Sequence, residues 1–308
     1  MALVVCGDES VAAARRPFPI RRRSISSPLK VAPAEASAKV AENHGALVAG
    51  VADPNQAALP GGKADFFRET AFETARREAN EEIGLPALDQ PLPAPFRVEH
   101  LCELPANLSV TEIVVRPCVA LLHSHDAATG ANADPEDAFM PRLDAKEVAA
   151  VFTGPFHNFL KSSDEARGAH ADNLPGSPTD WYEGVWTEWT SAPWRMHNFF
   201  VPITNQKVII SRQKSWEQDA PAAHGTPDSG PQRTTLGLER YRVFGLTARI
   251  LVDAARVAYG ETPEFEHNSQ LGDEDMIWRL TKLGRFAGTR DQNGPLTKEV
   301  FRRASKLS

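Results

Sequence analysis

The sequence predicts an α/β fold, in the form of an α/β/α sandwich whose mixed sheet lies between two helices. Strand-like segments flank a strongly patterned helical segment at residues 71–83, and a second amphipathic helical segment, Leu246–Tyr259, follows near the C-terminal end. Helices and sheets of this pattern bury one face each, so stacking them in layers is the expected solution.

The composition suits one sizeable domain with appendages. The chain has 308 residues, 42% of them hydrophobic, and a formal net charge of -6. This charge gives no general field that attracts nucleic acid or an anionic membrane, so we expect neither partner, and a small anionic substrate must be held locally. The three cysteines are too few for a disulfide framework. No apolar run reaches the roughly 20 residues that span a bilayer.

Both ends of the chain resemble leaders or signals in composition. Residues 1–43 combine arginines with Ala, Ser and Pro, which predicts a disordered leader, with a transit peptide as the alternative. The chain finishes with a peroxisomal tripeptide, Ser305-Lys306-Leu307, followed by Ser308, an extra residue that should weaken the signal. Peroxisomal, cytoplasmic and mitochondrial locations all stay open on these grounds.

Strand signals and turn signals outline a central domain of residues 44–260. The apolar run Ala46–Val51 precedes the helical segment, and Phe96–Leu104 and Val110–Leu122 have the alternation and β-branched content of strands. Gly154-Pro155 indicates a turn.

The second half of the chain contains irregular stretches. Segments rich in Asp, Gly, Pro and Ser predict surface insertions near 162–195 and 213–235, and residues 261–308 form a C-terminal extension. Four tryptophans lie close together in the first insertion, which favours the packing of an added hairpin over a stacking platform for a base. They are Trp181, Trp186, Trp189 and Trp194.

The helical segment 71–83 has signals at both of its ends. Thr70 followed by Glu73 is a capping box, and Gly84 stands where a C-cap glycine belongs. At about 100° per residue, one arc of the helix is apolar and a neighbouring arc is acidic. The apolar arc holds Phe72, Ala75, Ala79 and Ile83, and the acidic arc holds Glu78, Glu81 and Glu82.

Without a bound cation, three carboxylates near the C-terminal end of a helix slightly lower its stability. Glutamates three or four residues apart repel by about 0.2 to 0.5 kcal/mol per pair, and this end of the helix dipole prefers cations. A divalent cation would relieve the repulsion, and all-oxygen ligands suit Mg²⁺ or Mn²⁺ rather than zinc. The alternative is a solvated helix face.

The spacing of the fixed positions decides between these two interpretations. The run Glu69-x7-Arg77-Glu78-Ala79-x-Glu81-Glu82-x-Gly84-Leu85 resembles the Nudix signature E-x7-R-E-U-x-E-E-x-G-U, with every charged position present. The gap after Gly62 is one residue longer than in the common box, and Ala79 replaces a bulky aliphatic residue. The resemblance, over a Nudix box at residues 61–85, implies a Nudix sandwich and a metal-dependent hydrolase that cleaves a diphosphate bond.

The resemblance also implies roles for individual residues. The metal would be bound by the side chains of Glu78, Glu81 and Glu82 and by the carbonyl of Gly62. Catalytic roles would fall to Glu81, Glu82, Arg77 and Glu69, the last two as an ion pair that orients the helix. Lys63 and Gly61 would contact substrate, and Glu147 is a further candidate ligand or base, with a surface glutamate as the alternative.

A finer resemblance points to the coenzyme A diphosphatase branch of the Nudix hydrolases. The longer gap after Gly-Gly-Lys-x-Asp and the segment Thr74-Ala75-x-Arg77-Glu78 carry it, together with Glu147–Phe152, His197-Asn198-Phe199 and Phe244–Ala248. The branch usually has a basic segment before the box, of which only Gln56–Asp65 survives here. Coenzyme A or a derivative is the implied substrate, giving 3′,5′-ADP and 4′-phosphopantetheine. The alternatives are another nucleoside diphosphate derivative, such as ADP-ribose or a dinucleotide, and a degenerate Nudix domain that only binds.

Overall fold

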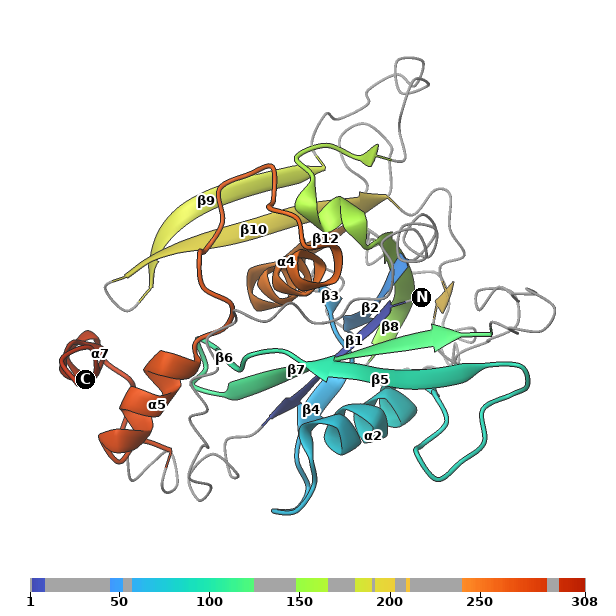
Figure 1. Cartoon of the computed structure of the whole chain (residues 1–308), viewed down its shortest axis with the longest axis horizontal. Coiled ribbons are helices and arrows are strands. Elements are labelled where there is room, and N and C mark those ends of the chain that lie inside the picture. The colour runs from blue at the N-terminus through green and yellow to red at the C-terminus, as the bar shows by residue number, and fades with distance from the viewer. Residues whose placement is uncertain are drawn as a thin grey trace, which may run out of the picture.

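The computed structural model of the chain describes residues 2–8, 45–51, 57–124, 148–165, 181–189, 192–202, 209–210, 240–286 and 294–307. These residues form two sheets and the helices that cover them (Figure 1). The strands are β1 (Ala2–Asp8), β2 (Gly45–Val51), β3 (Ala57–Ala58), β4 (Gly61–Lys63), β5 (Arg97–Glu103), β6 (Asn107–Leu108), β7 (Val114–His123), β8 (Val148–Pro155), β9 (Tyr182–Trp189), β10 (Ala192–Pro202), β11 (Ile209–Ile210) and β12 (Arg240–Phe244). The helices are α2 (Ala71–Ile83), the 3₁₀ helix η1 (His157–Leu160), α4 (Gly245–Tyr259), α5 (Glu274–Lys282) and α7 (Lys298–Ala304).

The larger sheet is mixed. Within the described residues it has nine strands, in the order β11-β8-β2-β1-β7-β5, with β3, β4 and β6 paired to β2, β1 and β7. β1 runs parallel to β2 and β4 and antiparallel to β7. The smaller sheet has the order β12-β10-β9. The predicted α/β class is therefore confirmed.

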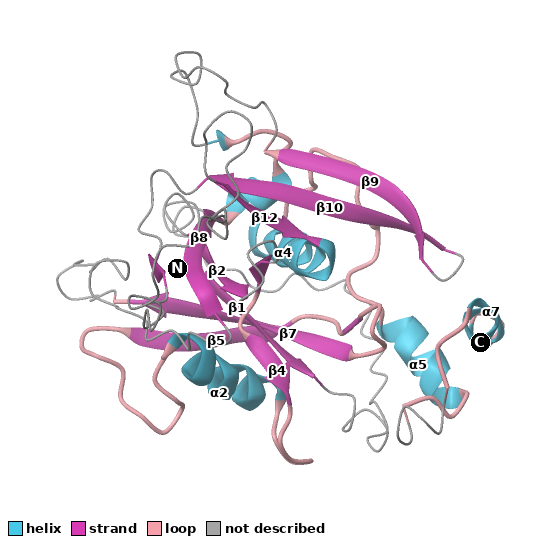
Figure 2. Cartoon of the chain, turned by 180° about the vertical axis from the view of Figure 1, so that it is seen from behind, coloured by secondary structure: helices cyan, strands magenta, loops and turns pink. Residues whose placement is uncertain are grey.

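Helices α2 and α4 lie on opposite faces of the larger sheet (Figure 1, Figure 2). The alternation of side chains along β7 shows this directly, because successive residues of a strand point to opposite faces. Cys118 and Ala120 pack in the cluster that contains the apolar arc of α2, whereas Val119 packs in the cluster that contains α4. The larger sheet thus separates two hydrophobic cores.

Helix α4 matches the predicted helix and ends at Gly260, which has a φ of 67°. Its buried face is wider than its sequence pattern predicts: Val252 and Ala255 are buried, while Val257 is exposed. The reason is that α4 lies between the two sheets (Figure 2), so its central turns are covered on more than one side.

One expectation for the N-terminal region is wrong. Residues Ala2–Asp8, which belong to the predicted disordered leader of residues 1–43, form β1. The run Leu3-Val4-Val5-Cys6 has strand composition, but its shortness and its Arg- and Pro-rich surroundings hide the signal. Residues 9–44 lie outside the described part of the chain.

Two further segment boundaries differ from expectation. β7 begins at Val114 rather than Val110, because Ser109–Glu112 forms a turn in which the Glu112 N–H donates to the Ser109 carbonyl at 3.0 Å. Gly154-Pro155 lies inside β8 rather than in a turn. Position 154 favours glycine because η1 approaches the strand closely: a Cβ there would lie 3.2 Å from the Phe159 ring.

The last part of the predicted insertion 162–195 contributes to the core instead of lying wholly on the surface. β9 and β10 form the expected hairpin, and Trp181 is 1% exposed among Phe159 and Phe199. The predicted insertion 213–235 lies outside the described residues.

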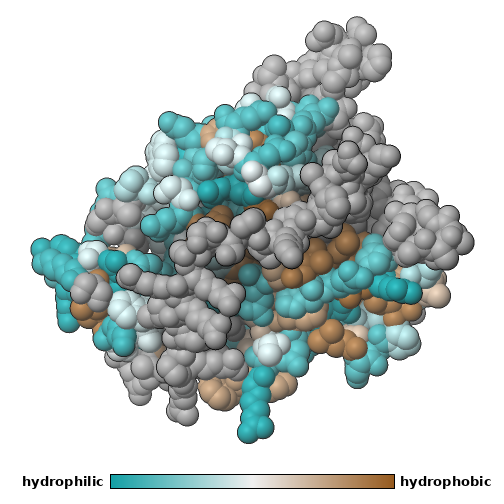
Figure 3. Space-filling model, viewed as in Figure 1, coloured by the Kyte–Doolittle hydropathy of each residue, from teal (hydrophilic) through white to brown (hydrophobic). Residues whose placement is uncertain are grey.

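The C-terminal helices α5 and α7 pack together against the end of the larger sheet. Phe301 and Ile277 are buried with Leu108 and Val114 in a third hydrophobic cluster. Elsewhere on the surface, apolar residues emerge over β5 and β7 (Figure 3), where Leu101 is exposed. Among the described helices, none combines the length and the apolar composition that a membrane-spanning helix requires.

Candidate active site

Helix α2 begins and ends as its sequence predicts. The Glu73 N–H donates to Thr70 Oγ1 at 3.2 Å, and the Thr70 N–H donates to the Glu73 carboxylate at 2.8 Å, which completes the capping box. Gly84 adopts a φ of 69° and its N–H donates to the Asn80 carbonyl at 3.0 Å. These two caps fix the ends of the helix, and so the direction in which its acidic residues point.

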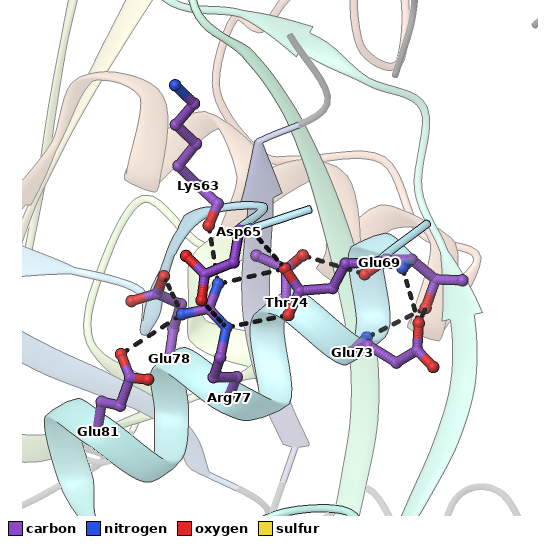
Figure 4. Close-up of polar contacts among 9 residues, drawn as sticks. Lys63, Asp65, Glu69, Glu73, Thr74, Arg77, Glu78 and Glu81 are labelled. Carbon is purple, nitrogen blue, oxygen red and sulfur yellow. Dashed lines mark hydrogen bonds and ion pairs between the residues drawn. The ribbon is translucent and has the colours of Figure 1, made fainter. Parts of the chain in front are cut away.

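Arg77 is the centre of the site (Figure 4). Its guanidinium faces four carboxylates within 4 Å and also donates to the Lys63 carbonyl at 2.8 Å. The carboxylates belong to Glu69 at 2.9 Å, Glu78 at 2.8 Å, Asp65 at 3.3 Å and Glu81 at 3.4 Å. One side chain therefore ties the helix to both the Gly-Gly-Lys strand and the loop that follows it.

The predicted ion pair of Glu69 and Arg77 is present, with Glu69 buried and Arg77 partly exposed. The Glu69 side chain is 4% exposed, and it also accepts from the Asp65 N–H at 2.8 Å. Burial opposes ionisation of Glu69, but the bonds from Arg77 and Asp65 outweigh it and lower its pKa. Glu69 is thus held as a carboxylate that orients Arg77.

Gly62 and Glu78 meet closely. Gly62 lies in β4, which runs parallel to β1, and a Cβ added to Gly62 would lie 2.4 Å from the Glu78 carboxylate carbon. Only glycine leaves room for that carboxylate against the strand backbone. The arrangement brings a charged oxygen ligand and an approachable backbone together, which fits the expected metal position.

The three predicted metal ligands differ in exposure. The side chain of Glu78 is 16% exposed and that of Glu81 54%, while Glu82 has intermediate exposure. Burial raises the pKa of Glu78, and repulsion from Glu81 and Asp65 adds to this effect, although Arg77 opposes it. A nearby cation would therefore favour the charged form of Glu78.

The acids of the box are spread along one guanidinium rather than gathered in a tight cluster. A tight cluster here means three ligand-type side chains whose ligand atoms all lie within 4.8 Å of one another. Within the described part of the chain, one such cluster is found, and it lies on β5 and β7 rather than in the box. The metal roles of Glu78, Glu81, Glu82 and Gly62 accordingly stay predictions.

The remaining site candidates have mixed outcomes. The Lys63 side chain is exposed and extends away from the carboxylates (Figure 4), and Gly61 precedes it in β4. Glu147 lies outside the described residues. His197 is 1% exposed and shares a 3.0 Å hydrogen bond with the Tyr182 hydroxyl, so it is part of the core of the smaller sheet.

Asp65 is a site residue that sequence reasoning did not single out. It binds Arg77 through its carboxylate and Glu69 through its backbone N–H. The available signal was its position four residues before Glu69 in the Gly-Gly-Lys-x-Asp run. Because it lies in a loop, only the folded path of that loop shows that it reaches Arg77.

Comparison with known proteins gives three relatives. The peroxisomal coenzyme A diphosphatase 1 of Saccharomyces cerevisiae is 28% identical over 241 residues, which cover 73% of this chain and 66% of that protein. From Arabidopsis thaliana, the mitochondrial Nudix hydrolase 15 is 28% identical over 68% of this chain and 50% of its own length, and the chloroplastic Nudix hydrolase 22 is 29% identical over 68% and 47%. No family model matches the chain.

These relatives confirm the resemblance to the Nudix hydrolases that the box predicts, and their names support the expectation of an enzyme. The chain spans about half to two thirds of the length of the curated relatives it matches. Their names refer to three different organelles, so the similarity does not single out a compartment.

Proposed function

We propose that this protein is a Nudix hydrolase that cleaves a diphosphate bond in coenzyme A or its derivatives, using Mg²⁺ or Mn²⁺. The two cores on either side of the larger sheet would then be those of the Nudix sandwich, with α2 as its catalytic helix. The observation that carries the proposal is the excess of acid around Arg77, where four carboxylates face one guanidinium beside the backbone of Gly62.

The donors at this place fit a hard cation. They are carboxylate and backbone oxygens, the ligands that Mg²⁺ and Mn²⁺ prefer, and one arginine leaves most of their negative charge uncompensated. Glu78, Glu81, Glu82 and the Gly62 carbonyl would hold the ion. When bound, it would neutralise charge on the diphosphate oxygens and help to activate the attacking water.

The residues of the chain supply position. Buried Glu69 holds Arg77, and Arg77 holds the Lys63 carbonyl, so strand β4 stays at a fixed distance from α2. Glu78 is then pressed against Gly62, while exposed Glu81 faces solvent, from which substrate and water arrive. The Lys63 ammonium, which extends away from the acids, would pair with a substrate phosphate.

Coenzyme A is proposed as substrate because of the finer sequence resemblance and because one relative is a coenzyme A diphosphatase. The products would be 3′,5′-ADP and 4′-phosphopantetheine. The test is to incubate the purified chain with coenzyme A, an acyl-coenzyme A, ADP-ribose and NADH, with Mg²⁺ or Mn²⁺, and to identify the products. Turnover of ADP-ribose or NADH but not of coenzyme A would overturn the substrate, and turnover of none would leave a binding domain.

The variant that tests the site is Glu82→Gln, which keeps the shape of the side chain but removes its charge. Losing a charged ligand should lower turnover about a hundredfold or more, with little loss of stability, because a repulsive carboxylate has gone. Glu183→Gln, an exposed position on β9, is the matched control and should keep wild-type turnover. Near-normal turnover of Glu82→Gln would show that these carboxylates are only a solvated helix face.

A further inference from the structure

A second cluster of ligand-type side chains lies at the edge of the larger sheet. His100 and Glu103 are on the edge strand β5 and Cys118 is on β7, and one ligand atom from each lies within 4.8 Å of the other two. His100 and Glu103 are exposed, whereas Cys118 is 0% exposed. The cluster thus has a buried thiol at its base and two polar ligands at its mouth.

A β-bulge brings these side chains to one side of the sheet. Residues three apart on a regular strand point to opposite faces, so His100 and Glu103 would normally diverge. In β5 the register shifts between His100 and Cys102, so that His100 pairs with Ala120 and Glu103 pairs with Cys118. Ala120 and Cys118 are two residues apart and both pack in the α2 cluster. The extra residue of the bulge therefore places all three ligands on the α2 side.

Neighbouring contacts orient the side chains of the cluster. The His100 ring stacks on Phe72 of α2, with 3.9 Å between ring centroids and 9° between their planes. The Glu103 carboxylate is 4.0 Å from the Arg116 guanidinium, which makes a shorter ion pair of 3.0 Å with Glu274. The Cys118 thiol is 4.0 Å from the Arg116 carbonyl. The imidazole is thus oriented, and the ion pair that the structure describes for the Glu103 carboxylate is a long one.

We propose that His100, Glu103 and Cys118 bind one zinc ion, through an imidazole nitrogen, a carboxylate oxygen and a thiolate sulfur. Zinc accepts this mixture of donors, and three protein ligands leave a fourth position for water. The thiolate distinguishes this place from the all-oxygen acids near Arg77, because soft sulfur does not suit Mg²⁺ or Mn²⁺. On binding, the thiol proton is released to solvent. The ion would tie the edge strand β5 to β7 beneath the first turn of α2.

The site can be tested with Co²⁺, which replaces zinc and reports a sulfur ligand by a thiolate-to-metal absorption band. The full chain is titrated with Co²⁺ in excess Mg²⁺, which keeps the carboxylates near Arg77 occupied. We expect the band to saturate at one Co²⁺ per chain and to disappear when Zn²⁺ is added. Cys118→Ser should abolish the band, and the matched control Cys102→Ser, at an exposed cysteine on β5, should keep it.

Two more variants keep the test decisive if Cys118→Ser does not fold. His100→Phe preserves a ring to stack on Phe72 but removes the nitrogen, and Glu103→Gln preserves size but removes the charge. Each variant should weaken Co²⁺ binding at least about tenfold. Loss of a residue that merely hydrogen-bonds a metal ligand already lowers metal affinity about tenfold or more, and loss of the ligand itself should cost no less. A wild-type chain without the thiolate band overturns the proposal, and so does a band of unchanged affinity in any of the three ligand variants. None of these readouts depends on hydrolase activity.

Discussion

At the scale of single residues, Arg77 holds together charges that would otherwise repel. It is the one cation described within 4 Å of Asp65, Glu69, Glu78 and Glu81, and it links them to the carbonyl of Lys63. The Arg77 side chain therefore both holds β4 against α2 and compensates the charge of the neighbouring carboxylates. A substitution of Arg77 should for this reason affect both stability and catalysis.

Arg77→Ala tests this double duty. It leaves the buried Glu69 carboxylate without its charged partner, which should cost about 2 kcal/mol or more of unfolding free energy. Turnover should fall as well, because β4 loses its link to α2. Urea unfolding and product formation measure the two effects. Arg68→Ala, at an exposed position in the same loop, is the control, and an Arg77→Ala chain as stable as this control would contradict the assigned role.

His197 predicts a pH dependence of stability. Burial, reinforced by the charge of Arg195, lowers the pKa of His197 to about 3 from an ordinary value of 6.5. Between these values the unfolded chain binds a proton that the folded chain does not, so stability is fully present above pH 6.5 and is lost as the pH falls toward 3. The slope is roughly 1.4 kcal/mol per pH unit.

The measurement is the urea unfolding free energy of the wild type and of His197→Gln at pH 7 and pH 5. The wild type should lose about 2 kcal/mol more than the variant over this interval, because the variant has no imidazole to protonate in its unfolded state. Equal losses in both proteins would show that His197 is protonated without cost in the folded state.

At the scale of elements, the C-terminal end of α2 decides where its acidic side chains point. Glu81 and Glu82 lie in the last turn, with Ile83 between them and Gly84, so the left-handed conformation of Gly84 fixes where the helix stops and where these acids point. α4 ends in the same way at Gly260, with a φ of 67°, but it carries none of the candidate site residues. The two caps therefore form a natural comparison.

Gly84→Ala and Gly260→Ala should each cost about 1 to 2 kcal/mol of stability, since both place a Cβ in the left-handed region. Only Gly84→Ala should also reduce turnover, because it disturbs the turn that carries Glu81 and Glu82. Melting temperature and product formation are compared for the two variants. If both lost turnover equally, global destabilisation rather than the position of the acids would be the cause.

At the scale of the whole molecule, the first strand of the chain lies in the middle of the larger sheet. β1 pairs with β2, β4 and β7, and its partners come from residues 45–51, 61–63 and 114–123. β4 carries Gly61, Gly62 and Lys63, so the strand that supports the site is itself supported by β1. The integrity of the site should thus depend on residues far from the box in sequence.

Val5→Pro tests that dependence, because proline in a central strand removes a ladder hydrogen bond and is poorly tolerated. It should destabilise the fold by roughly 3 kcal/mol or more and reduce turnover with it. The matched control is Val110→Pro, at a 77% exposed residue in the second position of the Ser109–Glu112 turn, where proline is favoured. Equal stability of the two variants would show that β1 is not part of the central sheet.

The sequence by itself determined the features that depend on residues close together in the chain. The capping box at Thr70, the glycine stop at Gly84, the apolar arc of α2 and the pair of Glu69 with Arg77 were all predicted and are all present. The caps and the apolar arc are predictable because a helix has a fixed period, so that residues three or four apart have a fixed relation. Glu69 precedes the N-cap of α2, and its pairing with Arg77 is what the resemblance to the Nudix signature implies.

The tertiary structure alone decided what depends on distant segments. The place of Ala2–Asp8 in the centre of the sheet, the two-sided burial of α4 and the reach of Asp65 to Arg77 have no local signal strong enough to predict them. The same is true of the bulge that turns His100 and Glu103 toward Cys118. Strand pairing and register are set by contacts with partners tens of residues away, and a shift of one residue changes which face a side chain occupies.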